Sequence, residues 1–140
     1  MLLPPCSLQR PLAIAGHPQG FTDGLKDRAV SYSRLVQTLS QMKGCLASGY
    51  PFVFGFTVYD SFEGDHVAKT GVVPMPGSGE SVLGGHAVMA VGYDDNDQRF
   101  IVRNSWGTGW GMHGYFAMPY SYLTDRSLAS DFWTIRLVTG

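Results

Sequence analysis

The stretch GGHAVMAVGYDD, residues 84–95, is followed after three residues by RFIVRNSWGTGWG, residues 99–111. Both stretches contain short apolar runs typical of strands, and the DDNDQ residues between the runs supply turn chemistry. We therefore predict an antiparallel β-hairpin. Its first strand begins with His86, and its second strand ends in Asn104.

Pairing of the two strands would bring the Asn104 amide within reach of the His86 ring. The amide oxygen could then accept the Nδ1 proton, which would fix the tautomer and leave the other ring nitrogen facing outward. Gly84 and Gly85 leave room for a substrate, and Trp106 could cover the hydrogen bond. A base with an orienting partner is part of the arrangement that activates a nucleophile. The alternative is a structural histidine beside an ordinary turn asparagine.

The rest of the chain predicts a sheet preceded by one helix. Apolar residues at three- and four-residue spacing indicate an amphipathic helix over residues 33–46, capped by Ser31 or Ser33. PFVFGFTVYDSF, residues 51–62, indicates a strand covered on both faces, and the glycine- and proline-rich residues 70–85 indicate a surface loop. Further strands are predicted over residues 86–93, 99–104, 114–118 and 132–138.

The composition narrows the class of protein. The chain has 140 residues, 44% of them hydrophobic, and a formal net charge of -1. These values favour one globular domain and argue against disorder and against a basic nucleic-acid-binding surface. The apolar runs are too short for a membrane helix, and the proline-broken N-terminus does not predict a signal peptide. We expect no nucleic-acid or membrane partner, and the compartment stays open with a slight preference for the cytoplasm.

No metal site and no cofactor are predicted. His17, His66 and His113 show no ligand spacing to one another or to the cysteines. The acidic residues of the 94–97 turn lack the remaining positions of a calcium loop, so a solvated hairpin turn is expected there.

The two motifs together closely resemble the histidine and asparagine regions of the papain-like cysteine peptidases. GGHAVMAVGYDD matches the family pattern H-A-V-x-x-V-G-Y, and FIVRNSWGTGWGMHGYFAMP matches N-S-W-G-x-x-W-G-x-x-G-Y. LASGYPFVFGFTVYDSF is similar to the helix and strand that precede the histidine in bacterial members. The resemblance covers residues 27–140 and implies an α+β fold, the C-terminal half of such an enzyme, with an antiparallel β-barrel-like sheet and a preceding helix. Residues 1–26 carry no resemblance and are expected to be irregular.

The resemblance implies hydrolysis of peptide bonds, with a peptide or protein as substrate. His86 corresponds to the catalytic imidazole, Asn104 to its orienting partner and Trp106 to the shielding indole. Gly85 and Ala87 are expected beside the substrate, Ala87 at the place of a small residue in the wall of the main specificity pocket. The framework of the asparagine loop is expected to comprise Ser105, Gly107 and Trp110.

The family's nucleophile has no recognisable counterpart in this sequence. Such enzymes place a cysteine at the start of a long helix, shortly after a glutamine that donates to the oxyanion. Cys6 lies among prolines, and Cys45 falls near the C-terminal end of the predicted helix on its apolar face, where the helix dipole disfavours a thiolate. The position of the oxyanion-donating glutamine is matched by none of the chain's candidates, which are Gln9, Gln19, Gln37 and Gln41.

Three functional hypotheses therefore stay open. In the first, the chain is a truncated cysteine peptidase whose thiolate comes from elsewhere, for example from a separate nucleophile-bearing half, and the chain alone is inactive. In the second, it is a non-catalytic fragment or pseudoenzyme that binds a peptide or protein. The third is an acyl-transfer enzyme of the transglutaminase type, which is not expected to contain NSWGTGWG.

Overall fold

The computed structural model describes residues 12–13 and 28–139, with side-chain surroundings described from residue 31 to residue 135. The strands are β1 (Leu12–Ala13), β2 (Arg28–Arg34), β3 (Phe52–Tyr59), β4 (Val82–Asp94), β5 (Arg99–Arg103), β6 (Tyr115–Pro119) and β7 (Ala129–Thr139). The helices are α2 (Leu39–Ala47), the 3-10 turn η1 (Asp60–Glu63), α3 (Asp65–Thr70) and α4 (Tyr120–Thr124).

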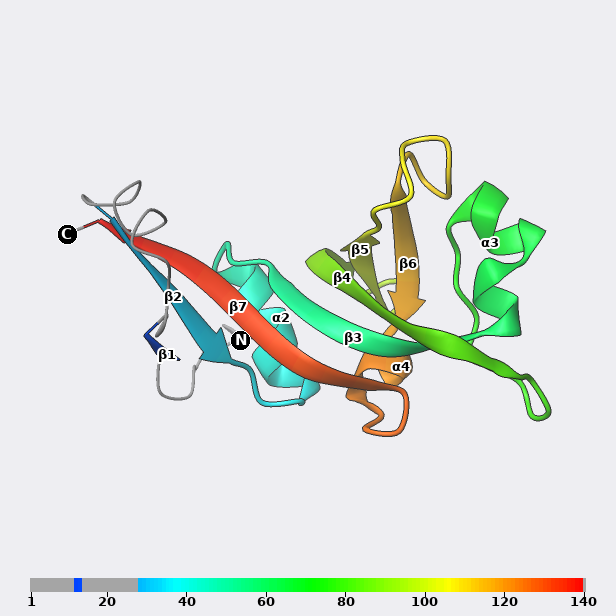
Figure 1. The fold of residues 1–140 in the computed structure, drawn as a ribbon, viewed down its shortest axis with the longest axis horizontal. Helices are drawn as coiled ribbons and strands as arrows, with labels where there is room; N and C mark the ends of the chain where they lie inside the picture. Colours follow the sequence, from blue (N-terminus) through cyan, green and yellow to red (C-terminus); the bar gives the residue numbers. More distant parts are fainter. Residues whose placement is uncertain (1–11, 14–27, 140) are drawn as a thin grey trace.

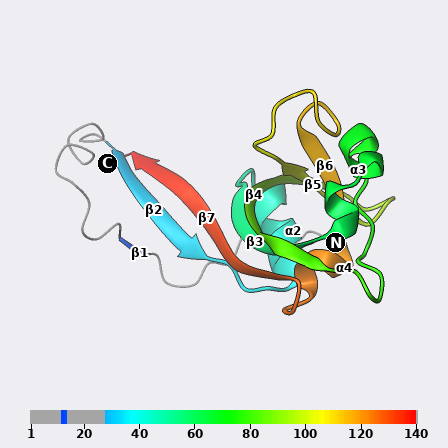
Figure 2. The same ribbon diagram turned by 45° about the vertical axis from the view of Figure 1, so that its right-hand side comes forward.

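The described strands form one antiparallel sheet in the order β1-β2-β7-β3-β4-β5-β6 (Figure 1). β2 and the second half of β7 pair as a two-stranded ribbon that extends away from the rest of the sheet. The other half of the sheet, from β3 to β6, curls around in Figure 2. β6 does not pair with β1, so the predicted α+β class is confirmed, with a curled sheet that stays open rather than a closed barrel.

The core lies on one face of β3, where every second side chain is buried. Phe52, Phe54 and Phe56 point into it, and the Phe54 ring stacks on Phe132 of β7 at a centroid distance of 5.4 Å. The intervening residues of β3 are only half-buried. The predicted strand is therefore confirmed, but the prediction that both of its faces are covered is wrong, because only one face packs against the core.

The predicted helix over residues 33–46 begins too early. The structure has a strand, β2, up to Arg34, and the helix α2 starts at Leu39 after an N-cap, Thr38, whose side chain accepts a hydrogen bond from the Gln41 N–H. Neither Ser31 nor Ser33 caps it, because both pair with β7. Pairing with a distant strand outweighs the local helical spacing of these residues.

The predicted loop over residues 70–85 is shorter than expected. The residues between β3 and this loop form η1 and α3, which the sequence analysis does not predict. The loop ends early because β4 already begins at Val82. The predicted hairpin is confirmed, since β4 and β5 pair in antiparallel register through Met89↔Arg103 and Asp94↔Arg99.

The predicted irregular segment, residues 1–26, is described only at Leu12–Ala13, and these two residues are a strand that pairs with β2. The rest of that segment lies outside the described residues, so the predicted boundary between residues 26 and 27 stays a prediction. Among the helices that the structure describes, none is both long enough and apolar enough to cross a membrane.

We expect Phe54→Ala to lower the free energy of unfolding by about 3–5 kcal/mol, because it leaves a cavity between β3 and β7. Val82→Ala is the control, since Val82 is 60% exposed and its loss should cost less than about 1 kcal/mol. Urea unfolding followed by far-UV circular dichroism measures both changes. Equal losses in the two variants would contradict the placement of the core.

Candidate active site

A hydrogen bond joins the two residues that the hairpin was predicted to bring together. His86 lies in β4, Asn104 follows the last residue of β5, and the His86 Nε2 atom is 2.8 Å from the Asn104 Oδ1 atom. The predicted approach of these two side chains is confirmed. Asn104 is 7% exposed, so the bond is sheltered from water.

The ring nitrogen in this bond is not the one that we predicted. The Asn104 Oδ1 atom also accepts the N–H of Ser105 at 2.8 Å, which identifies this atom as the amide oxygen. An oxygen with no hydrogen can only accept, so Nε2 of a neutral His86 carries the proton. The prediction of an Nδ1 bond is wrong because Asn104 lies diagonally across the hairpin, within reach of the far end of the ring only. Nδ1 has no hydrogen-bond partner among the described residues.

Aromatic rings pack against one side of the imidazole. The Trp106 ring stacks on His86 at a centroid distance of 5.1 Å and an interplanar angle of 23°, as expected of a shielding indole. Its own exposed fraction is 41%. Phe56 and Phe62 contact the imidazole at centroid distances of 5.8 and 6.4 Å. One side of the ring therefore faces aromatic carbon, which excludes water and fixes the ring plane.

Phe62 is a site residue that sequence reasoning missed. It lies in η1, is 1% exposed, and contacts Trp106 and Trp110 at 5.6 Å as well as His86. It had been predicted only as the last residue of a strand. The sequence YDSF gives one indication of such a role, because an aromatic residue directly follows polar turn residues. Nothing in the local sequence indicates which loop this aromatic residue packs against.

A carboxylate holds η1 to the loop before β4. Glu80 accepts the N–H of Ser61 at 2.8 Å and the N–H of Gly77 at 2.6 Å. The Gly77 N–H, followed by that of Ser61, lowers the pKa of Glu80. Asp60 completes the connection by accepting the Ser81 N–H at 3.0 Å. These bonds fix the turn that carries Phe62 against the imidazole.

The backbone of the asparagine loop sets the position of Asn104. Its N–H donates to the Gly114 carbonyl at 2.9 Å, and the Gly114 N–H donates to the Trp110 carbonyl at 2.8 Å. Gly107 and Gly111 have φ values of 91° and 61°, which side-chain-bearing residues rarely adopt. The predicted framework residues are thus placed around the amide, with Ser105 bonded to it and Trp110 half-buried beneath Trp106.

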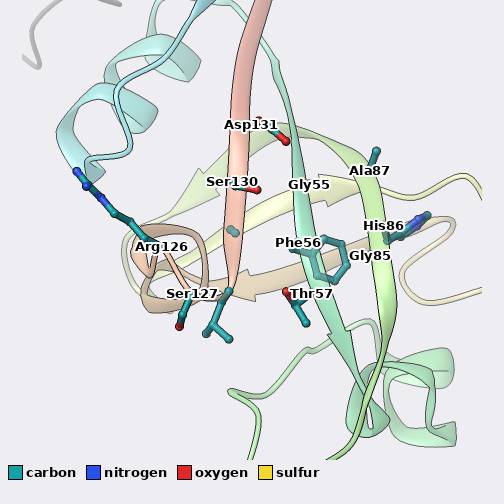
Figure 3. Close-up of a pocket in the computed structure, with 12 residues that line it drawn as sticks. Gly55, Phe56, Thr57, Gly85, His86, Ala87, Arg126, Ser127, Ser130 and Asp131 are labelled. Atoms are coloured by element: carbon teal, nitrogen blue, oxygen red, sulfur yellow. The ribbon is translucent and has the colours of Figure 1, made fainter.

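A pocket of about 440 Å³ lies next to His86, between β4, β3 and the start of β7 (Figure 3). Gly85 and Ala87, the two residues that the resemblance implies to lie beside a substrate, line this pocket, and their role in binding stays a prediction. Tyr122 supports its wall by donating to the Thr57 carbonyl at 2.6 Å. Burial raises the pKa of Tyr122, so the hydroxyl keeps the proton that it donates. Other residues that line the pocket are Gly55, Phe56, Arg126, Ser127, Leu128, Ala129, Ser130 and Asp131.

The two cysteines fall in different parts of the chain. Cys45 lies on α2 with no exposed surface and belongs to the hydrophobic core, as predicted. Cys6, Gln9, Gln19 and His17 lie outside the described residues. The Gln37 amide donates to the Leu123 and Ala129 carbonyls and so connects the chain before α2 to α4 and to the start of β7. Within the described ranges, no group of three potential metal ligands comes together.

An imidazole oriented by an amide beside a pocket can serve as the acid–base part of a site for nucleophilic hydrolysis. Comparison with known proteins identifies the class. The family model described as papain family cysteine protease matches residues 21–131. The chain therefore belongs to the papain family of cysteine proteases.

Individual relatives agree with this assignment. The uncharacterized peptidase C1-like protein of Acanthamoeba polyphaga mimivirus is 51% identical over 120 residues, which cover 80% of this chain and 39% of that protein. The crystal structure of xylellain, a cysteine protease from Xylella fastidiosa, is 48% identical with a TM-score of 0.71, over 75% of this chain and 39% of that one. The bromelain protease of Ananas comosus, in complex with the E64 inhibitor, is 25% identical with a TM-score of 0.52, over 78% and 50% of the two chains. The chain thus spans about two fifths of the length of the first two relatives.

We expect neutral His86 to adopt the Nε2–H tautomer, because Asn104 offers only an acceptor to Nε2. Nitrogen and carbon-bound proton NMR shifts of the uncharged ring distinguish the two tautomers. Asn104→Ala should return the ring to a mixture of both. A dominant Nδ1–H form in the unmodified chain would contradict the observed geometry.

Gly111→Ala should destabilise the asparagine loop more than Gly79→Ala does. Both glycines have positive φ, but a Cβ at Gly111 would lie 2.6 Å from the Tyr115 carbonyl oxygen, whereas a Cβ at Gly79 meets nothing within 4 Å. Strain alone costs about 1–2 kcal/mol at each position, and the collision adds about 1–3 kcal/mol at Gly111. Urea unfolding of the two variants measures the difference, and equal losses would refute the collision.

Proposed function

We propose that this chain supplies the histidine and asparagine of a cysteine peptidase site that hydrolyses peptide bonds. In this proposal the thiolate comes from a polypeptide segment other than residues 28–139. The observation that carries the proposal is the bond from His86 Nε2–H to Asn104 Oδ1, sheltered beneath Trp106. This bond uses one ring nitrogen for orientation and leaves Nδ1 for chemistry.

The proposed reaction has two steps. The thiolate attacks the carbonyl carbon of the substrate, and the Nδ1–H of the His86 imidazolium gives its proton to the leaving amine as the C–N bond breaks. A thioester remains. Nδ1 then takes a proton from water, whose oxygen attacks the thioester carbon and releases the thiolate together with a carboxylic acid. Asn104 holds the ring plane during both proton transfers, so the same nitrogen serves as acid and then as base.

An unpaired strand edge beside His86 supports a peptide as substrate. β4 pairs with β3 from Val82 to Ala90, but it pairs with β5 only from Met89 onward. In the described part of the chain, residues 82–88 therefore offer backbone donors and acceptors along one edge. An extended peptide can pair with such an edge while a side chain enters the neighbouring pocket.

A non-catalytic, peptide-binding protein is the second candidate function. The burial of Cys45 favours it, because a thiol without exposed surface cannot attack a substrate. The pocket and the open edge would serve binding alone equally well. The two candidates differ in one property, which is turnover in the presence of a suitable thiolate.

Complementation separates the two candidates. The chain is mixed with the part of the Xylella fastidiosa protease that lies outside the region aligned with this chain, and hydrolysis of fluorogenic peptides is followed. We expect no turnover by the chain alone and measurable turnover by the mixture. His86→Ala should reduce that turnover by at least about 100-fold, because proton transfer to the leaving group is lost. His66→Ala, a change of the same type at an exposed position of α3, should leave turnover unaltered.

Two results would overturn the proposal. Turnover by the chain alone that depends on His86 would show that one of its own thiols is the nucleophile. An inactive mixture that still binds peptide at the His86 pocket would favour the non-catalytic function. Iodoacetamide labelling followed by mass spectrometry identifies the reacting cysteine in the first case.

A further inference from the structure

The carboxylate of Glu80 connects η1 with the loop before β4 by accepting backbone N–H groups from both segments. We propose that Glu80 is a positioning residue for His86, and that it acts through the place that η1 gives to Phe62. This inference deepens the proposed function, in which His86 transfers the proton, and its consequence for turnover rests on that function. Its consequence for the His86 ring can be measured on this chain alone.

The connection follows the register of the two strands. The last pair of β3 with β4 lies directly before Asp60 on one strand and directly after Ser81 on the other. Asp60 accepts the Ser81 N–H at 3.0 Å, and Glu80 accepts the Ser61 N–H at 2.8 Å. The two segments therefore stay connected for two residues beyond the sheet, with side-chain oxygens in place of backbone carbonyls.

Glu80 makes the larger part of this connection. Its Oε1 atom accepts the Ser61 N–H and its Oε2 atom accepts the Gly77 N–H at 2.6 Å, so both oxygens are used. Hydrogen bonds to a charged acceptor are stronger than those between neutral groups. Asp60 accepts one bond, on an exposed side chain. The turn η1 has four residues and no side-chain cap at its N-terminus, so it depends on such outside bonds for its position.

This connection places Phe62, which directly follows Ser61. The centroid of the Phe62 ring lies 6.4 Å from that of His86 and 5.6 Å from that of Trp106. Trp106 in turn stacks on the imidazole. A displaced Phe62 would leave space beside the imidazole, and the ring would be free to turn away from Asn104. The connection also holds the start of β4, the strand that carries His86.

The test compares Glu80→Gln with Glu63→Gln in the full, isotope-labelled chain by NMR. Glutamine keeps the length of the side chain and one acceptor oxygen, but its NH2 group cannot accept the second N–H. We expect Glu80→Gln to lower the ratio of the Nε2–H to the Nδ1–H tautomer of neutral His86 by about 2- to 10-fold, because the ring is held less firmly against Asn104. Contacts between the ring protons of Phe62 and His86 should weaken as well.

Glu63→Gln is the control for the loss of charge. Glu63 lies on the same turn and lines a hollow of about 110 Å³ together with His86. In the part of the chain that the structure describes, its side chain has no hydrogen bond or ion pair. Glu63→Gln therefore removes a negative charge near the imidazole and leaves the connection intact. It should not change the tautomer ratio, because both tautomers are uncharged.

A double-mutant cycle tests whether Glu80 acts through Phe62. In a Phe62→Leu background, Glu80→Gln should lower the tautomer ratio no further, because the ring through which it acts is absent. Far-UV circular dichroism shows which variants fold. Should Phe62→Leu fail to fold, the ring-proton contacts in Glu80→Gln decide the question instead.

Turnover gives a second measurement. In the complemented mixture, Glu80→Gln should lower kcat by about 2- to 10-fold and change KM less, because the proton-transferring ring is displaced while the pocket beside it is not.

The outcomes separate positioning from stability and from the proposed function. An unchanged tautomer ratio with a lower free energy of unfolding in Glu80→Gln would show that Glu80 only stabilises the loop, which refutes the inference. Equal effects of Glu80→Gln and Glu63→Gln, or full additivity in the cycle, would refute it too. A mixture without turnover counts against the proposed function but leaves the tautomer result, and with it the positioning role, in place.

Discussion

The hydrogen bond between His86 Nε2 and Asn104 Oδ1 is the constraint on which the site depends. It fixes which nitrogen carries the proton, and hence which nitrogen can act on a substrate. The bond is directional and part-buried, so its length depends on how the asparagine loop places the amide. The surrounding aromatic rings and glycine turns can be understood as the means of holding two side chains from adjacent strands at 2.8 Å.

Different parts of the chain contribute differently to that geometry. The hairpin of β4 and β5 brings the imidazole and the amide together, whereas the loop after β5 orients the amide through backbone bonds to Gly114 and Ser105. η1 adds Phe62 from a third direction. Because each contribution comes from a packed or paired element, the imidazole and the amide are ordered by the described residues of this chain. In the proposed function, such preorganisation would leave little reorganisation to be made at the moment of reaction.

Sequence reasoning succeeded where a structure depends on residues close together in the chain, and it failed where the structure depends on pairing between distant segments. The approach of His86 and Asn104 was predictable in outline because a short turn joins their two strands, whereas the bulge between Ala90 and Gly92 that shifts the register of the hairpin was not predicted. The start of α2 was not predictable, since Ser33 pairs with Thr134, about a hundred residues later. The choice between Nδ1 and Nε2 depended on a diagonal distance that no local pattern encodes. The irregularity in β7 near Asp131 was not predictable for a similar reason, because it exists only in the pairing of β7 with β3.

The unpaired edge of β4 has a consequence for the behaviour of the chain in solution. Backbone groups that can receive an extended peptide can equally receive a strand from another molecule, so the same edge is a route to aggregation. Residues 82–88 read VLGGHAV and contain no lysine or proline of the kind that usually protects an exposed edge. Gly84 and Gly85 in this segment are poor strand formers, and this weak strand propensity opposes pairing with another molecule. If the proposed function holds, pairing with a peptide and resistance to self-association make opposite demands on these seven residues.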